Sequence, residues 1–157
     1  MYPVSSNDLN RDDEKEVRFF TTAFHPLDNF SAHAVRIWER KFMTAEHAYQ
    51  WKKLSDIHPE AAEEIYEAGS PELVKAIAAG QASMLPGEWH EVKVAMMEEI
   101  LRAKANQHED VREVLRKSGT RTIIENSPAD TFWGVGPEGD GLNTLGKLWM
   151  KIREEIA

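Results

Sequence analysis

The ten residues from Thr44 to Lys53 read TAEHAYQWKK and give the clearest helix signal in the chain. Thr44 has a side-chain oxygen that can cap a helix, and Glu46 follows in the first turn, where a carboxylate suits the helix dipole. The pattern predicts a helix that continues to about Ser55. At about 3.6 residues per turn, four polar side chains fall on one face of it: Glu46, Tyr49, Gln50 and Lys53.

Such a stripe has an ordinary interpretation, a solvated face with a Glu–Lys pair. In this helix a phenol and an amide separate the two charges, and Ala45, Ala48 and Trp51 indicate that the other sides are packed as well. A polar stripe on a largely buried helix must face a partner, water or a ligand. The spacing therefore suggests a binding or catalytic face, and the solvated face stays open as the alternative.

The rest of the chain predicts a helix-rich α+β single domain with a few short strands. Strands are expected at residues 17–22, 34–42, 120–124 and 132–135, and residues 1–16 are expected to form a disordered acidic tail before a domain at 17–157. Helices are expected at residues 58–69, 70–80, 109–117, after Gly87 and after Asn143. In the helix after Gly87, five residues have core spacing: Trp89, Val92, Met96, Ile100 and Ala103.

Composition excludes several functional classes. The chain has 157 residues and no cysteine, which rules out disulfides and thiolate metal sites, and its six histidines show no paired-ligand spacing, so no metal is expected. The net charge of −8 argues against broad binding to a nucleic-acid backbone but allows a small anionic ligand. Without a membrane span or a signal segment, a cytoplasmic location is expected.

A glycine-rich segment before the last predicted helix is the second candidate region. Gly134 to Gly139 matches GxGxxG, but the dinucleotide fingerprint opens a βαβ unit, and only one helix follows here. The glycines still permit close backbone approach, and the helix that Asn143 is expected to cap could hold an anion through free N–H groups. A plain surface turn is equally compatible. Trp133, beside Asp130, could stack on a base, whereas Trp89 and Trp149 are more typical of a core.

At these segments the sequence resembles the YbiA-like (NADAR) proteins. The resembling blocks are FHPLDNFS (24–31), TAEHAYQ (44–50), WHEVK (89–93), LRAKANQH (101–108) and SPADTFWG (127–134), followed by Gly139, Asn143, Leu145 and Gly146. They occur in order over nearly the whole chain. Asp28 departs from the family pattern, which often has a small or hydroxyl residue before the asparagine, so an altered pocket edge is expected there.

The resemblance implies a YbiA-like fold and hydrolysis of an N-glycosidic bond in a phosphorylated ribosyl compound. Two substrate types are implied: phosphoribosylamino-pyrimidine intermediates of riboflavin biosynthesis, and ADP-ribose linked to guanine, which makes ADP-ribosylated nucleic acid a candidate partner. No cofactor is expected. A non-catalytic module that binds ADP-ribose-like ligands is the alternative, and a regulatory protein that uses the acidic tail as its contact is a third. Oligomeric state is left open.

The implied chemistry assigns roles to particular residues. Positive charge builds at ribose C1 as the bond breaks, so a carboxylate should stabilise it or activate water. Glu46 is the first candidate and Asp130 the second. Lys53 could bind phosphate or attack C1 and form an imine, and the chemical role is preferred. Substrate contacts are expected from eight further residues: Asn29, Phe30, Tyr49, Gln50, Trp89, Trp133, Gly134 and Asn143.

Overall fold

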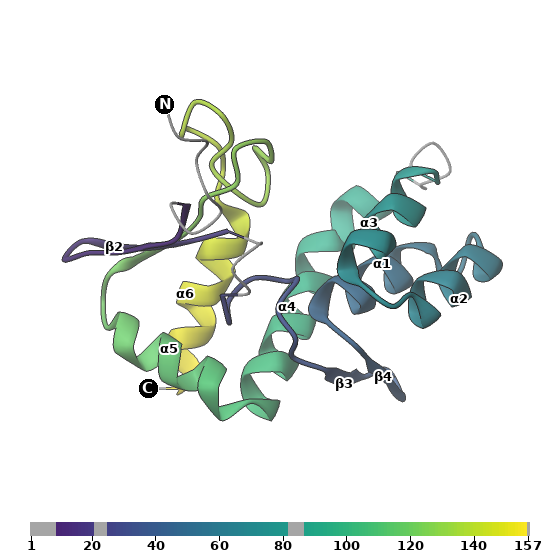
Figure 1. The fold of residues 1–157 in the computed structure, drawn as a ribbon, viewed down its shortest axis with the longest axis horizontal. Coiled ribbons are helices and arrows are strands. Elements are labelled where there is room, and N and C mark those ends of the chain that lie inside the picture. The colour runs from purple at the N-terminus through teal and green to yellow at the C-terminus, as the bar shows by residue number, and fades with distance from the viewer. Residues whose placement is uncertain (1–8, 21–24, 82–86, 157) are drawn as a thin grey trace. The chain divides into compact units, whose positions relative to one another are not determined.

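The structure, a computed structural model, describes residues 9–20, 25–81 and 87–156. In these ranges it contains six helices and five short strands, so the predicted helix-rich α+β class is confirmed (Figure 1). No helix among the described residues combines the length and the apolar character needed to cross a bilayer. The chain forms two compact units, one from residues 1–31 and 108–157 and the other from residues 32–107.

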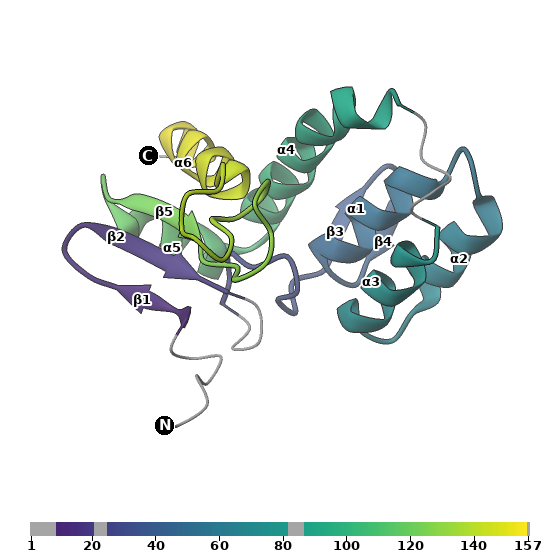
Figure 2. The same cartoon turned by 90° about the horizontal axis from the view of Figure 1, so that it is seen from above.

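The first unit is built on a three-stranded sheet with the order β1-β2-β5 (Figure 2). Strand β1 (Arg11–Asp12) runs antiparallel to β2 (Glu16–Phe19), and β2 runs parallel to β5 (Thr122–Glu125). Along the central strand the side chains alternate, and Val17 and Phe19 are buried. One face of the sheet therefore packs into a core.

Two helices complete the first unit, α5 (Glu109–Ser118) and α6 (Thr144–Ile156). Helix α6 packs on β5, and α5 packs on α6. Trp149 of α6 is fully buried, and its indole N–H donates to the carbonyl oxygen of Leu27 at 2.8 Å. Gly146 allows the close approach of α6 to β5, because a Cβ at this position would overlap a backbone oxygen of the strand.

Residues 9–16 belong to this unit, so the prediction of a disordered tail up to Glu16 is wrong for them. Asp13 Oδ1 accepts hydrogen bonds from the backbone N–H groups of Lys15 at 2.8 Å and Glu16 at 3.0 Å, which closes the turn between β1 and β2. The same hydrogen bonds hold the pKa of the Asp13 carboxyl below its usual value. Aspartate is common both in tight turns and in acidic disordered segments, so composition alone does not distinguish the two. Residues 1–8 of the predicted tail lie outside the described residues.

The second unit is a set of four helices with one hairpin. Helix α1 (Ala45–Leu54) packs against α2 (Pro59–Glu67), α3 (Pro71–Ala79) and α4 (Trp89–Gln107). The predicted positions of all four helices are confirmed, with Thr44 as the N-cap of α1. The apolar cluster of this unit is made of small and medium side chains: Leu54, Ala61, Ala62, Ile65, Ala68, Val74 and Ala78.

The buried face of α4 differs from the predicted one. Val92 is 42% exposed, and Met96 and Ala103 are only partly buried. The buried set is Trp89, Met97, Ile100, Leu101, Lys104 and Ala105. Met96 and Met97 are adjacent apolar residues, as are Ile100 and Leu101, so two apolar stripes one residue apart are possible on α4. Tertiary packing buries the stripe that contains Met97, Leu101 and Lys104. A lysine consequently takes a core position on this helix.

The sequence prediction of one strand over residues 34–42 is wrong, because β3 (Val35–Ile37) and β4 (Arg40–Phe42) form an antiparallel hairpin. Trp38 and Glu39 make the turn with φ values of 52° and 65°. Two positive φ values are typical of the two-residue turn that Asn-Gly favours, and Trp-Glu gives no such signal. The Trp38 ring holds the turn by stacking on Trp51, with centroids 6.3 Å apart.

Candidate active site on helix α1

The polar face of α1 is a buried carboxylate–amide pair. Glu46 and Gln50 are each 8% exposed, which excludes the solvated-face interpretation. Gln50 Nε2 donates to Glu46 Oε1 at 2.9 Å, so the amide orients the carboxylate. The Oε1 atom of Gln50 is buried and accepts no hydrogen bond from the residues that the structure describes. A ligand donor at this oxygen would compensate its desolvation.

Lys53 lies at the C-terminal end of the same stripe. Burial lowers the pKa of its amine below the ordinary lysine value, the Glu46 carboxylate opposes this shift, and Lys93 adds to it. The Lys53 Nζ lies 6.0 Å from the centroid of the Tyr49 ring. A lowered pKa increases the neutral fraction of the amine, which is the form that can attack a carbon atom.

Lys93 is a site residue that sequence reasoning missed. It lies on α4, and the packing of α4 against α1 brings it near enough to Lys53 to disfavour a second positive charge. The available signal was its place four residues after Trp89, because residues at that spacing share a helix face. Without knowledge of which helices pack together, that signal could not be connected to Lys53.

Trp89 of α4 packs against the aromatic member of the stripe. Its ring lies 5.5 Å from that of Tyr49 at an angle of 51°, and only 6% of Trp89 and 5% of Tyr49 is exposed. Trp89 is therefore a core residue of this unit, as its residue type predicts. Tyr49 is the member of this pair that lies near Lys53, and stacking of Trp89 on a heterocycle stays a prediction.

A buried histidine fixes the start of α1. His47 is fully buried; its Nδ1 lies 2.7 Å from Thr44 Oγ1 and its Nε2 lies 2.9 Å from Ala68 O. A carbonyl oxygen can only accept, so Nε2 carries the proton and Nδ1 accepts from the Thr44 hydroxyl. Thr44 Oγ1 also accepts from the His47 backbone N–H at 3.2 Å. These bonds tie the first turn of α1, with Glu46 in it, to the end of α2.

In the first unit, Asp130 organises the loop before α6. Its Oδ1 accepts from the backbone N–H groups of Phe132 at 2.9 Å and Trp133 at 2.8 Å. The two aromatic rings meet edge to face, 4.8 Å apart. The predicted strand at residues 132–135 is wrong, because this segment forms bends. Asp130 therefore has a local structural role in addition to the catalytic role predicted for it.

The predicted anion site at the start of α6 is wrong for its first amides. The backbone N–H groups of Asn143, Thr144 and Leu145 donate to the carbonyl oxygens of residues 134, 132 and 133 at 3.0–3.1 Å. The Asn143 side chain is also used within the protein, since Nδ2 donates to Ile123 O and Oδ1 accepts from Glu125 N, both at 2.9 Å. Asn143 thus joins α6 to β5, and its contact with substrate stays a prediction.

Gly134 is required by packing within the protein. A Cβ at this position would lie 2.8 Å from Glu125 Oε2 and 3.0 Å from the Cβ of Ser127. Among the other predicted residues, Asn29 and Phe30 are partly buried, and the Phe30 backbone N–H donates to Asp28 Oδ1 at 2.8 Å. Asp28 is 2% exposed, so it shapes this loop from within.

The structure therefore brings five of the predicted site residues together on α1 and α4 in the second unit: Glu46, Tyr49, Gln50, Lys53 and Trp89. The other six belong to the first unit: Asn29, Phe30, Asp130, Trp133, Gly134 and Asn143. A buried carboxylate beside an amine of lowered pKa is the part of the molecule best suited to acid–base or nucleophilic chemistry.

A comparison with known protein families finds a match over nearly the whole chain. The NADAR domain matches residues 10–157. The chain belongs to the NADAR family. The family domain starts at residue 10 and includes strand β1, whereas the predicted domain starts at residue 17.

Several relatives of this NADAR protein are N-glycosidases. It is 40% identical over 131 residues to N-glycosidase Npun_R5314 of Nostoc punctiforme, a match that covers 83% of this chain and 84% of that protein. It is 31% identical over 143 residues to N-glycosidase YbiA of Escherichia coli, which covers 90% of this chain and 88% of YbiA. These matches confirm the predicted enzyme class, a glycosidase that hydrolyses N-glycosidic bonds.

Two further matches concern the fold and a longer relative. The NMR structure of Escherichia coli YbiA superposes with a TM-score of 0.81 at 27% identity, covering 99% of this chain and 93% of that one. The riboflavin biosynthesis protein PYRR of Zea mays is 31% identical over 155 residues, which is 89% of this chain but 25% of PYRR. The YbiA-like fold predicted from sequence is therefore confirmed.

Proposed function

We propose that this NADAR protein cleaves the bond between ribose C1 and nitrogen in phosphoribosylamino-pyrimidine intermediates of riboflavin biosynthesis. The observation that carries the proposal is the buried face of α1, where Glu46 is oriented by Gln50 and Lys53 has a lowered pKa. The name of the Zea mays relative supports the substrate class. A small anionic substrate also agrees with the chain's net charge of −8, which disfavours binding to a long polyanion.

Glu46 is suited to the charge that develops during cleavage. As the C1–N bond breaks, its electron pair moves to nitrogen and positive charge builds at C1. A buried carboxylate stabilises that charge, because electrostatic interactions are stronger away from water. In a direct hydrolysis, Glu46 takes a proton from water, the hydroxide adds to C1, and a proton is transferred to the departing nitrogen.

Lys53 allows a covalent route over the same face. Its neutral amine attacks C1 while the C1–N bond electrons leave with the base, which takes up a proton. Opening of the ribose ring then gives an imine between Nζ and C1, and water hydrolyses this imine to release the free sugar and regenerate the amine. We assign Lys53 this nucleophilic role, and phosphate binding by Lys53 is the competing role that the experiment tests.

Mass spectrometry of the purified protein with substrate, with and without borohydride, tests the proposal. Borohydride reduces an imine to a stable amine, so the covalent route predicts an adduct on Lys53 in addition to free base. Lys53→Met should abolish the adduct, whereas Lys52→Met on the neighbouring position should retain it. Release of base without an adduct in any variant would leave the glycosidase in place and contradict the nucleophilic role.

Glu46 is tested by its isosteric amide. Glu46→Gln keeps the volume of the side chain and removes its charge, so we expect base release to slow by roughly 10²- to 10⁴-fold, the usual contribution of a catalytic acid–base group. Glu64→Gln, an exposed carboxylate on α2, is the matched control and should retain full activity. Full turnover by a folded Glu46→Gln variant would contradict the assignment.

The substrate is tested by offering a guanine-linked ADP-ribose in parallel. Preferential release of the pyrimidine base supports the riboflavin-type substrate, and preferential release of guanine would contradict it. Tight binding of both compounds without release of either base would contradict catalysis on these substrates and favour a non-catalytic binding module.

A further inference from the structure

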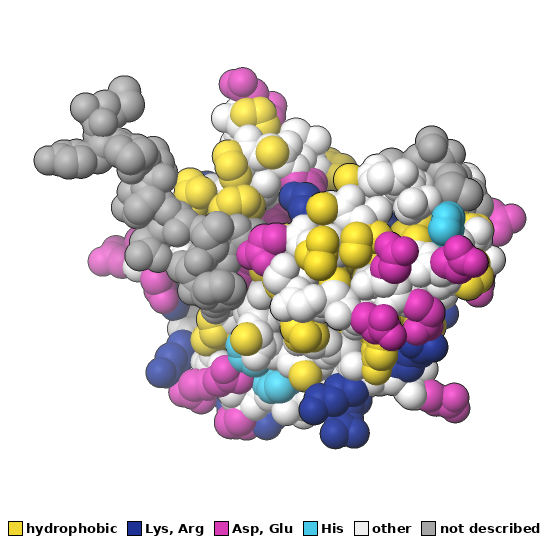
Figure 3. Space-filling view, turned by 45° about the vertical axis from the view of Figure 1, so that its right-hand side comes forward, with side chains coloured by type: hydrophobic (Ala, Val, Ile, Leu, Met, Phe, Trp, Pro, Cys, Tyr) yellow, Lys and Arg dark blue, Asp and Glu magenta, His cyan; other side chains and the backbone are white. Residues whose placement is uncertain are grey.

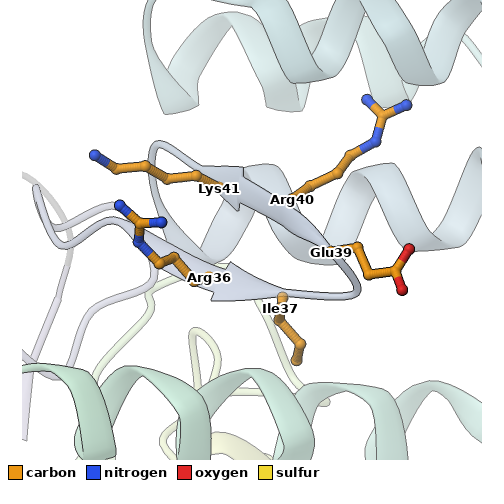
Figure 4. A pocket seen from close by; sticks show the side chains of 5 residues that line it. All are labelled: Arg36, Ile37, Glu39, Arg40 and Lys41. Carbon is orange, nitrogen blue, oxygen red and sulfur yellow. The ribbon is translucent and has the colours of Figure 1, made fainter.

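The β3–β4 hairpin carries two like charges on its outer face. The strand register places Arg36 directly opposite Lys41, and both side chains are exposed. Figure 4 shows the two side chains extending to the same side of the hairpin. Like charges directly opposite each other destabilise a strand pair. Neither side chain has an ion-pair or hydrogen-bond partner among the residues that the structure describes.

The third cation of the hairpin, Arg40, has neighbouring side chains that compensate its charge. Arg40 forms an ion pair with Glu63 at 2.8 Å, and its guanidinium lies over the rings of Trp51 and Tyr66 at 5.1 and 4.8 Å from their centroids. Lys52 likewise lies 4.9 Å from the centroid of the Trp38 ring. The surrounding residues thus compensate two cations of this region and leave the Arg36–Lys41 pair uncompensated.

The backbone fixes the positions of this pair. Gln107 of α4 donates to Arg36 O and accepts from Arg36 N, both at 2.8 Å, which holds β3 in place. The turn places Trp38 and Glu39 at positive φ, a conformation that is strained for residues other than glycine. The hairpin register is therefore kept although it carries both turn strain and charge repulsion.

The hairpin also lines an open hollow. Its volume is about 400 Å³, and it opens widely to solvent. The lining residues are Arg36, Ile37, Glu39, Arg40 and Lys41 (Figure 4). Asp and Glu side chains are scattered over the face of the protein shown in Figure 3, as expected for an acidic chain. Arg36 and Lys41 therefore form a small positively charged patch on a protein whose net charge is negative.

We infer that Arg36 and Lys41 bind a phosphate monoester at the outer face of the β3–β4 hairpin. A monoester carries about −1.5 to −2 charges near neutral pH, which matches two cations, whereas a carboxylate or a phosphodiester supplies only one charge. The guanidinium can engage two phosphate oxygens at once, and the lysine adds a point charge. Neither residue belongs to α1, so this inference stands separately from the reaction proposed for Glu46 and Lys53.

Backbone-amide NMR of the full chain tests the site with four probes: inorganic phosphate, ribose 5-phosphate, ribose, and a short oligonucleotide without a terminal phosphate. We expect inorganic phosphate and ribose 5-phosphate to shift the amide signals of residues 35–41, and ribose to leave them unchanged. Equal shifts with ribose, or tighter binding of the oligonucleotide than of ribose 5-phosphate, would overturn the monoester assignment.

A charge-matched pair of double variants locates the binding. Arg36→Gln/Lys41→Gln should weaken ribose 5-phosphate binding by about tenfold or more, since each factor of ten corresponds to about 1.4 kcal/mol. Lys75→Gln/Lys147→Gln removes the same charge at two exposed lysines outside the hairpin and should leave the affinity within about twofold. Retained affinity in the hairpin variant, with an intact amide spectrum, would overturn the inference.

Discussion

The burial of His47 predicts that the protein loses stability in mild acid. Desolvation lowers the pKa of this imidazole below its ordinary value of 6.5, and the hydrogen bond to Ala68 O opposes the shift only in part. The unfolded chain therefore binds more protons than the folded chain between the lowered pKa and 6.5. The free energy of unfolding is at its full value above about pH 6.5 and falls as the pH decreases through this interval.

The size of the effect is bounded by one proton. Each proton bound only by the unfolded chain changes the free energy of unfolding by about 1.4 kcal/mol per pH unit. If folded His47 stays neutral, protonation of the unfolded imidazole lowers the free energy of unfolding by at most about 1.4 kcal/mol between about pH 7.5 and about pH 5.5. Folded stabilities are only about 5–15 kcal/mol, so the loss is measurable.

Urea denaturation at about pH 7.5 and about pH 5.5 measures this loss. Comparison with variants separates the contribution of His47 from that of the other titrating groups. His47→Gln removes the titration, so the free energy of unfolding should fall less with decreasing pH than in the unmodified chain, by up to about 1.4 kcal/mol. His90→Gln, at an exposed position, should behave like the unmodified chain. An equal pH dependence in His47→Gln and the unmodified chain would refute the reasoning.

Three further substitutions test the contacts of Thr44, Gly146 and Gln50. Thr44→Ala removes the N-cap of α1 and the partner of a buried imidazole, so urea unfolding should show a loss of about 1–2 kcal/mol. Gly146→Ala forces a Cβ onto a backbone oxygen of β5 and should destabilise by about 2–3 kcal/mol, whereas Gly69→Ala, with no atom within 4 Å, should be nearly neutral; equal effects would contradict this packing. Gln50→Leu removes the amide donor of the buried Glu46 carboxylate, so we expect base release to slow by about tenfold or more in a variant that loses about 1–3 kcal/mol of stability but stays folded; undiminished release would contradict the orienting role.

Local signals were sufficient for much of the second unit. Thr44 and Ser70 accept hydrogen bonds at the starts of α1 and α3, as their positions before helical patterns predict. The stripe with Glu46 and Lys53 followed from helical spacing alone. These features depend on residues within a few positions of one another, so the sequence carries them directly.

Features that depend on tertiary contacts could not be predicted in the same way. Sequence spacing does not tell that α4 presents Lys93 to Lys53, or that the amides at the start of α6 donate to the carbonyl oxygens of residues 132–134. The Trp38–Glu39 turn is held by ring contacts with another element, against its own backbone preference. In each case a partner distant in sequence decides the outcome, which local propensity does not contain.

Borohydride trapping during turnover tests the central claim most directly, because it asks whether the buried face of α1 carries the reaction. With a phosphoribosylamino-pyrimidine as substrate, we predict release of the free base and a reduced ribosyl adduct that maps to Lys53. Intact substrate after prolonged incubation with folded protein would contradict the proposed activity on this substrate. An adduct that maps outside α1 would contradict the proposed site.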